Sequence, residues 1–367
     1  MSLPFPASGR ARTPIKLVVV ALLFPIFLAL ALPGTYLAAF HHPTPTHMKV
    51  AIIDSSPAAA GVQQALENEA GDALDVSLVP DVAAAEDAVK DMTLRAAYDP
   101  STGELFTASA GSLLATQAVT SIFTEVVERT GGEQVTSLTV RDLAPLPADD
   151  RAGISLFFVG LAGIIAGFVA PTVLGVAVPG LRRRTELAVI GGVAVVSGVI
   201  GTYTAYVAFG ALTTNIVGAG LMISAGALVA GLVQSGGMRL IGPAMSIVGL
   251  TLFVILGIPA SGAAVPIDMI PQFFQFLHNG LPTSGALEGL RRVVYFDGQG
   301  VMRDISILVL WALIGIGLHW LSTLKTPKPG VAVPVAALEP TPGETLAPPS
   351  VDDATSLTPQ LKETASA

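Results

Sequence analysis

Three histidines, His41, His42 and His47, are the side chains in this sequence best suited to binding a metal ion, because imidazole nitrogen is a common metal ligand. Their spacing is not that of a ligand pair on one helix face, two prolines lie between them, and no carboxylate is fixed beside them. We therefore interpret the segment as a junction between two parts of the chain, with a metal site as the alternative. We expect no cofactor.

The serines are arranged no better for catalysis. Ser55 and Ser56 lack the G-x-S-x-G turn that exposes a nucleophile. Residues 109–112 (Ser-Ala-Gly-Ser) could present backbone amides to an anion, but we favour a plain helix start there. The absence of cysteine excludes thiol catalysis, Fe–S clusters and disulfides. The chain also lacks the GxxxxGK[ST] motif of an ATPase. The sequence predicts no enzyme.

Charge in this chain is sparse and segregated. Of 367 residues, 51% are hydrophobic and 13% are charged, which is about half the charged share of a soluble domain. The formal net charge is −8, and acidic residues gather in residues 41–152 and in the C-terminal tail. No basic cluster is large enough for a nucleic-acid partner. We interpret the run Arg182, Arg183 and Arg184 as a topology signal.

Most of the sequence between residues 154 and 321 is apolar and is cut into blocks of roughly 20 residues. A helix rises about 1.5 Å per residue and the hydrocarbon core is about 30 Å thick, so each block can cross a membrane. With a further block near the N-terminus, we predict six transmembrane helices at about residues 15–38, 154–178, 187–209, 213–234, 240–258 and 303–323.

Positive charge near the ends of these spans predicts their orientation, because Lys and Arg mark cytoplasmic loops. With the N-terminus inside, the inner positions hold Arg10, Arg12, Lys16, Arg182, Arg183, Arg184, Arg239, Lys325 and Lys328. Only Arg291, Arg292 and Arg303 fall on the outer side. We expect a multi-pass protein of the cell membrane with both termini in the cytoplasm. The first span exceeds the h-region of a signal peptide, so we favour an uncleaved anchor over a cleaved signal.

The polar stretch between the first two spans predicts a small α/β extracellular domain. Its strands are expected at residues 49–54, 74–79, 94–98, 104–108 and 134–142, and its helices at 57–70, 81–91 (capped by Asp81) and 112–129. The predicted order along the chain is a cytoplasmic N-terminus (1–14), helix one (15–40), the extracellular domain (41–152), a five-helix bundle (153–324) and a disordered cytoplasmic tail (325–367).

The middles of the predicted spans contain no Asp, Glu, Lys or Arg. Because buried charges mark ion-coupled carriers and proton relays, this pattern argues against both, and energy is expected to come from another subunit. His319 is expected within reach of the headgroups. Gly160, Gly163 and Gly167 form a stripe that allows close helix packing, either within the chain or against a second copy.

The loop at residues 259–302 is too apolar to be free in water, and prolines break it into pieces too short to span. It predicts two short helices that lie re-entrant at the outer leaflet, the second amphipathic with Arg291 and Arg292 at headgroup level. The candidate outer gate comprises Pro259, Ser261, Gly262, Pro266, Pro271, Phe273, Pro282, Arg291 and Arg292.

This layout and loop resemble the ABC-2 type family of ABC transporter permeases, in the subgroup with a large extracellular domain after helix one, and the related phage infection protein family. The resemblance extends to about residue 323. The matching loop elements are Pro259-Ala260-Ser261-Gly262, Met269-Ile270-Pro271-Gln272-Phe273, Leu281-Pro282 and Leu290-Arg291-Arg292-Val293-Val294-Tyr295-Phe296.

The resemblance implies a dimeric permease subunit, homo- or heterodimeric, driven by a separate nucleotide-binding ATPase. Such a subunit exports a lipid, drug, polysaccharide or peptide. Arg182, Arg183 and Arg184 match the position of the family's ATPase-contacting loop. Two departures leave an alternative open, since residues 1–14 are not an amphipathic helix and the arginine loop is short. The alternative is a non-transporting envelope protein, either a surface receptor or a scaffold for a secretion machine.

Overall fold

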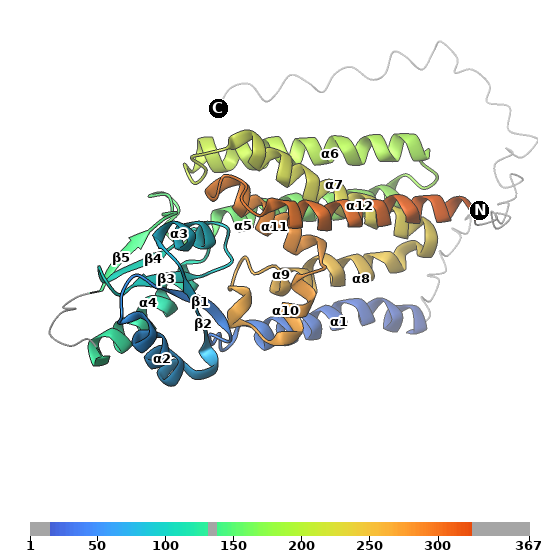
Figure 1. The fold of residues 1–367 in the computed structure, drawn as a ribbon. Coiled ribbons are helices and arrows are strands. Elements are labelled where there is room, and N and C mark those ends of the chain that lie inside the picture. The colour runs from blue at the N-terminus through green and yellow to red at the C-terminus, as the bar shows by residue number, and fades with distance from the viewer. Residues whose placement is uncertain (1–14, 131–137, 325–367) are drawn as a thin grey trace, which may run out of the picture. The chain divides into compact units, whose positions relative to one another are not determined.

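The computed structural model describes residues 15–130 and 138–324. Within these ranges, long helices form a bundle, and shorter helices flank a five-stranded sheet (Figure 1). The predicted N-terminal segment (1–14), the start of the last predicted strand (134–137) and the predicted tail (325–367) lie outside the described residues.

Among the described residues, five segments are long and apolar enough to cross a membrane, as expected of a polytopic helical membrane protein. They lie in α1 (Ile15–Phe40), α5 (Ser155–Ala177), α6 (Arg183–Tyr203) with the π-helical η2 (Thr204–Ala208), α7 (Ile216–Ile241) with its continuation, and α12 (Val301–Leu324). Helix α6 begins at Arg183 and not near residue 187 as predicted, so Arg183 and Arg184 belong to its first turn.

The fourth of these segments, Ile216–Ala260, is 45 residues long and folds back on itself. Its parts after α7 are the 3₁₀ turn η3 (Gly242–Ala244), α8 (Met245–Leu250), the π-helical η4 (Thr251–Ile255) and α9 (Gly257–Ala260). A Cβ added to Gly249 would lie 2.1 Å from Oε1 of Gln234, although a straight helix would separate the two residues by about 22 Å. Gly242, at φ 66°, supplies the left-handed conformation for the turn. The two arms correspond to the fourth and fifth predicted spans.

Helix α7 is central to the bundle, because it packs against α5, α6 and α12. The predicted glycine stripe on α5 lies in this packing. A Cβ on Gly167 would stand 2.0 Å from the carbonyl oxygen of Ala227, and one on Gly163 would stand 2.7 Å from Ile223. The stripe therefore serves contact within the chain. Large apolar side chains such as Val199 and Leu313 remain exposed, as expected of surfaces that face lipid.

The sheet has the strand order β2-β1-β3-β4-β5. Its strands are β1 (Met48–Ile53), β2 (Leu74–Val79), β3 (Ala96–Asp99), β4 (Glu104–Thr107) and β5 (Thr139–Asp142). β1 pairs in parallel with β2 and β3, β3 and β4 form the predicted antiparallel hairpin, and β5 pairs in parallel with β4. We call residues 46–150 the α/β region.

Helices cover both faces of this sheet because β1 alternates its side chains between two apolar clusters. Val50 and Ile52 face α2 (Ala59–Ala70) and α4 (Leu113–Thr130), whereas Ala51 and Ile53 face α3 (Val82–Lys90). A short 3₁₀ turn, η1 (Gly71–Ala73), links α2 to β2. Asp81 caps α3 as predicted, because its carboxylate accepts a hydrogen bond from Ala84 N at 2.8 Å.

Candidate functional site

The segment between α9 and α12, residues 261–300, folds back into the bundle and is called the connecting loop below. It contains η5 (Ile267–Met269) and two short helices, α10 (Gln272–His278) and α11 (Pro282–Tyr295), where the sequence predicted two. Pro271 stands at the N-cap of α10, and Pro282 begins α11. Proline fits both places because the first turn of a helix needs no amide donor.

Helix α11 has the predicted amphipathic pattern, and most of its residues are buried. It packs against α5, α7 and α12. Gly285 and Gly289 let the start of α12 come close, since a Cβ on Gly285 would stand 3.0 Å from the carbonyl oxygen of Asp304. In contrast, Phe273 and Phe276 on α10 are exposed. α11 therefore closes one end of the bundle from within.

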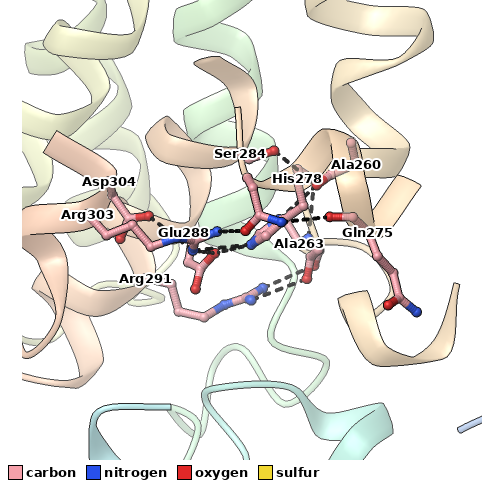
Figure 2. A network of polar contacts seen from close by, with 12 residues as sticks. Ala260, Ala263, Gln275, His278, Ser284, Glu288, Arg291, Arg303 and Asp304 are labelled. Atoms are coloured by element: carbon pink, nitrogen blue, oxygen red, sulfur yellow. Dashed lines mark hydrogen bonds and ion pairs between the residues drawn. The ribbon is translucent and has the colours of Figure 1, made fainter. Parts of the chain in front are cut away.

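Glu288 on α11 is the centre of a buried ion network (Figure 2). Its Oε2 lies 2.7 Å from Nε2 of His278, and its Oε1 accepts from Nη2 of Arg292 at 2.8 Å. Arg303 approaches the same carboxylate at 3.3 Å. Burial alone would raise the pKa of Glu288, but the hydrogen bond and charge of His278 and the charge of Arg292 outweigh it and hold that pKa well below its usual range.

A second carboxylate, Asp304 at the start of α12, extends the network. Its side chain is fully buried, its Oδ2 lies 3.2 Å from Nε of Arg292, and its Oδ1 lies 3.9 Å from Nη1 of Arg303. Neither oxygen of Asp304 has a hydrogen-bond partner among the described residues, so its side chain is held by these ion pairs and not by hydrogen bonds. Removing the partner of any one of these buried charges would destabilise the folded protein.

Arg291 and Arg292, which were predicted at headgroup level, both have partners within the protein. Arg292 is 7% exposed and lies inside the ion network. Arg291 is half-buried and donates to the carbonyl oxygens of Gly262 at 3.4 Å and Ala263 at 3.1 Å (Figure 2). Partners within the protein therefore account for Arg291 and Arg292, which the prediction of orientation from positive charge left unexplained.

The predicted motif Pro259-Ala260-Ser261-Gly262 ends helix α9. The hydroxyl of Ser261 donates to Ile258 O at 2.7 Å and accepts from Ala263 N at 3.2 Å, and Gly262 is left-handed at φ 68°. The carbonyl of Ala260 accepts from Ser284 Oγ, and Nδ1 of His278 lies 2.9 Å from it. Both ring nitrogens of His278 thus lie close to oxygens, Nδ1 to that of Ala260 and Nε2 to that of Glu288, and Nη1 of Arg303 lies 3.4 Å from Nε2.

The π-helical η4 widens the helix before this point, and side chains from elsewhere bind its carbonyl groups. Thr283 of α11 donates to Phe253 O at 3.1 Å, and Tyr36 of α1 donates to Val254 O at 3.1 Å. In a membrane, carbonyl groups released from a helix need such partners. Two of the predicted gate residues, Pro266 and Pro271, flank η5 and have extended backbones (ψ 145° and 146°).

The second predicted site lies at the opposite end of the bundle, between α5 and α6. None of the side chains of Arg182, Arg183 and Arg184 forms an ion pair or a hydrogen bond with any part of the chain that the structure describes. Beside them, Nε of Arg239 donates to Glu186 at 2.8 Å, closing the end of α7 onto α6. A cavity of about 230 Å³ lies next to this pair, lined partly by Pro179, Leu181 and Met238.

Of the three histidines of the predicted junction, His41 and His42 lie next to each other, with ring centroids 6.4 Å apart, and His47 has a partner elsewhere. His47 pairs with Asp75 at 2.9 Å, and His41 lies on the carbonyl of Leu37 at 2.6 Å. His319, expected near the headgroups, is instead 2% exposed and lies 2.8 Å from Ser235 Oγ, between α7 and α12. Residues 15–130 and 138–324 contain no group of three or more His, Cys, Asp or Glu side chains placed to hold a metal.

The sequence analysis did not identify Glu288 or Asp304, the two carboxylates of the ion network, as site residues. One signal was available, because Glu288 and Arg292 are four residues apart on a predicted helix, the spacing of an ion pair. Nothing in the sequence joins His278 or Asp304 to them, since these residues come from other helices.

No protein-family model matches this chain, and neither a curated protein nor a solved structure matches it.

Proposed function

We propose that this chain is the permease subunit of an ABC-2 type exporter, which moves a lipid-like, drug-like or polymer substrate outward using a separate ATPase subunit. The observation that carries the proposal is the connecting loop, whose helix α11 packs between α5, α7 and α12. A loop that returns into the bundle closes a transmembrane path at one end without adding a span. This is the layout that the family resemblance implies.

In this proposal the chain crosses the cell membrane six times. The 45-residue segment Ile216–Ala260 supplies two of these crossings, because about 20 residues suffice for one and the segment turns back at Gly242. Both termini then lie in the cytoplasm, the α/β region lies outside, and the connecting loop is the outer gate. Two such chains form the working dimer.

The unpartnered arginines between α5 and α6 are the proposed contact with the ATPase. Arg182 and Arg184 are exposed and Arg183 is half-buried, so all three guanidiniums can bind carboxylates of a partner. The Arg239–Glu186 pair would transmit movement of this loop to the long helix α7, whose other end lies beside α11. ATP binding at one end of the bundle could thereby displace the gate at the other.

The test is ATP hydrolysis in nanodiscs that contain this chain and the ATPase encoded in an adjacent reading frame. We expect the chain to stimulate hydrolysis several-fold, and we expect the triple change Arg182→Glu, Arg183→Glu and Arg184→Glu to abolish stimulation. Arg129→Glu is the matched control, because Arg129 is an exposed arginine of the α/β region. Unchanged hydrolysis with the wild-type chain would contradict the proposal.

One observation favours the second candidate, a non-transporting envelope protein. Because α6 begins at Arg183, only residues 178–182 separate it from α5, which leaves little surface for an ATPase to grip. Purification from native membranes in mild detergent separates the two functions. A stoichiometric ATPase in the purified complex supports the exporter, whereas secretion or cell-wall proteins in its place support the scaffold.

A further inference from the structure

A nearly buried ion pair joins the α/β region to the connecting loop. Arg95, just before β3, donates from Nε to Oδ2 of Asp268 at 2.6 Å and from Nη2 to Oδ1 at 3.2 Å. The Arg95 side chain is 19% exposed and that of Asp268 is 14% exposed. A two-pronged guanidinium–carboxylate contact of this kind fixes both distance and orientation. The two residues are 173 positions apart in the sequence, so the pair is a tertiary contact.

Further contacts hold both partners against the α/β region. The amide of Arg95 donates to Lys49 O on β1 at 2.8 Å, which ties the arginine to the centre of the sheet. The carbonyl oxygen of Asp268 accepts from Thr46 N at 2.8 Å. The next residue, Met269, is 5% exposed and belongs to the same apolar cluster as Val50 of β1. One turn of the loop is therefore part of the core of the α/β region.

The far end of the loop is held in the same way. Nη1 of Arg292 donates to the carbonyl oxygen of Asp91 at 2.7 Å, while the rest of its guanidinium faces Glu288 and Asp304. Phe296 is buried in the apolar cluster beneath α3. The α/β region thus contacts the connecting loop at two places, before α10 and at the end of α11. A movement of α11 must either break these contacts or carry the α/β region with it.

We propose that Arg95 and Asp268 are positioning residues that hold the connecting loop closed, so that the α/β region serves as the frame of the gate. This inference rests on the proposed function in one respect, namely that the loop is a gate. It assigns the α/β region a role that the sequence left open, and it makes release of Asp268 from Arg95 a step in opening. Of the two contacts between the region and the loop, this one is the more exposed, since the side chains of Arg95 and Asp268 are 19% and 14% exposed and that of Arg292 is 9% exposed.

The first test is hydrogen exchange on the full-length protein in nanodiscs, which needs no ATPase. Arg95→Ala and Asp268→Asn should each speed amide exchange in residues 262–278 about ten- to hundredfold, the effect of leaving one charge without its partner. The charge swap Arg95→Asp with Asp268→Arg should restore much of the protection. Arg129→Ala, which removes an exposed arginine of the same region, should change nothing in the loop.

The second readout is cysteine labelling, which a purely structural role would not move. The chain has no native cysteine, so Ser261→Cys introduces a single thiol at a position that is 1% exposed. Its reaction with a membrane-impermeant maleimide should be slow in the wild-type background, several-fold faster with Arg95→Ala and slow again in the charge swap.

The inference would be overturned by unchanged exchange and labelling in both single variants, or by a charge swap that restores neither. Uniformly faster exchange throughout the α/β region would overturn it as well, because the pair would then merely stabilise the fold. If Arg95→Ala does not fold, Arg95→Lys replaces it and should raise exchange in the loop less strongly. If the variants show that the Arg95–Asp268 pair holds the loop, but the chain fails to stimulate an ATPase, only the proposed function would be contradicted.

Discussion

Two sets of three arginines are used in opposite ways: Arg291, Arg292 and Arg303 at the connecting loop, and Arg182, Arg183 and Arg184 between α5 and α6. Arg292 and Arg303 form ion pairs with the carboxylates of Glu288 and Asp304, and Arg291 donates to two carbonyl groups. Arg239, next to the second set, pairs with Glu186, but the side chains of Arg182, Arg183 and Arg184 form no ion pair or hydrogen bond with the described parts of the chain. The difference is made by the partners that the fold brings, because the residue type is the same. Paired arginines fix the structure, and unpaired arginines remain available to another molecule.

This comparison separates a stability role from a binding role. A charge in a buried place cannot lose its partner cheaply, whereas an exposed charge in water contributes little to folding. Substitutions at the connecting loop should therefore act on folding, and the same kind of substitution at residues 182–184 should act on partners. Four predictions test this division, beginning with the largest expected effect.

Removing the central carboxylate should have the largest effect. Glu288→Gln leaves Arg292, Arg303 and His278 without their shared counter-charge, and we expect a loss of about 3–5 kcal/mol in unfolding free energy. Urea unfolding of the purified protein in detergent measures it. Glu69→Gln removes an exposed partner of Arg129 and is the control, expected to cost less than about 1 kcal/mol. Equal losses of unfolding free energy in the two variants would contradict the division between buried and exposed charges.

The stabilisation that Glu288 provides should be lost as the pH falls. The pKa of Glu288 in the folded protein lies under the value of 4.5 that the group has in an unfolded chain. Its stabilisation is therefore complete above about pH 4.5 and declines by up to about 1.4 kcal/mol per pH unit as the pH falls further. The difference in stability between wild type and Glu288→Gln should shrink as the pH falls below about 4.5. A difference that shrank on raising the pH would have the wrong sign.

Shortening a guanidinium should distinguish the members of the paired set. Arg292→Lys keeps the charge but cannot reach Glu288, Asp304 and the carbonyl of Asp91 together, and should cost about 1–3 kcal/mol. Arg303→Lys should cost less than about 1 kcal/mol, because the Arg303 side chain is 39% exposed. The same urea titration compares the two. A larger loss at Arg303 would mean that burial does not set the energy of this network.

The unpaired set should give the smallest change in stability. Replacing Arg182, Arg183 and Arg184 together by Gln should alter the unfolding free energy by less than about 0.5 kcal/mol, as for surface positions in general. A larger loss would reveal a structural role for these arginines and remove the contrast between the two ends.

The sequence alone was enough for features that depend on neighbours along the chain. Strand β2 was predicted at residues 74–79 and lies at Leu74–Val79, because its alternation is bounded by turn residues on both sides. The Asp81 cap and the β3–β4 hairpin were likewise predicted from residues next to each other. The long helices followed from length and hydropathy.

The ion network could not be predicted, and the sequence analysis therefore did not anticipate that α11 is buried. An amphipathic helix with Glu288 and Arg292 on its polar face normally shows that face to water or headgroups. Here the polar face meets His278 from α10 and Asp304 from α12, so the helix is buried on both sides. Contact between residues on separate helices is a property of the fold, and no local pattern encodes it. For the same reason nothing in the sequence indicated that His319, expected within reach of the headgroups, would be buried beside Ser235 of α7.

Photo-crosslinking from the two ends of the bundle tests the central claim most directly. A photoreactive residue at position 183 and another at position 291 are introduced separately, and the membranes are irradiated with and without ATP. We predict a crosslink to a nucleotide-binding ATPase from position 183 and only intramolecular products from position 291. A crosslink to the ATPase from position 291, or from neither position, would contradict the account.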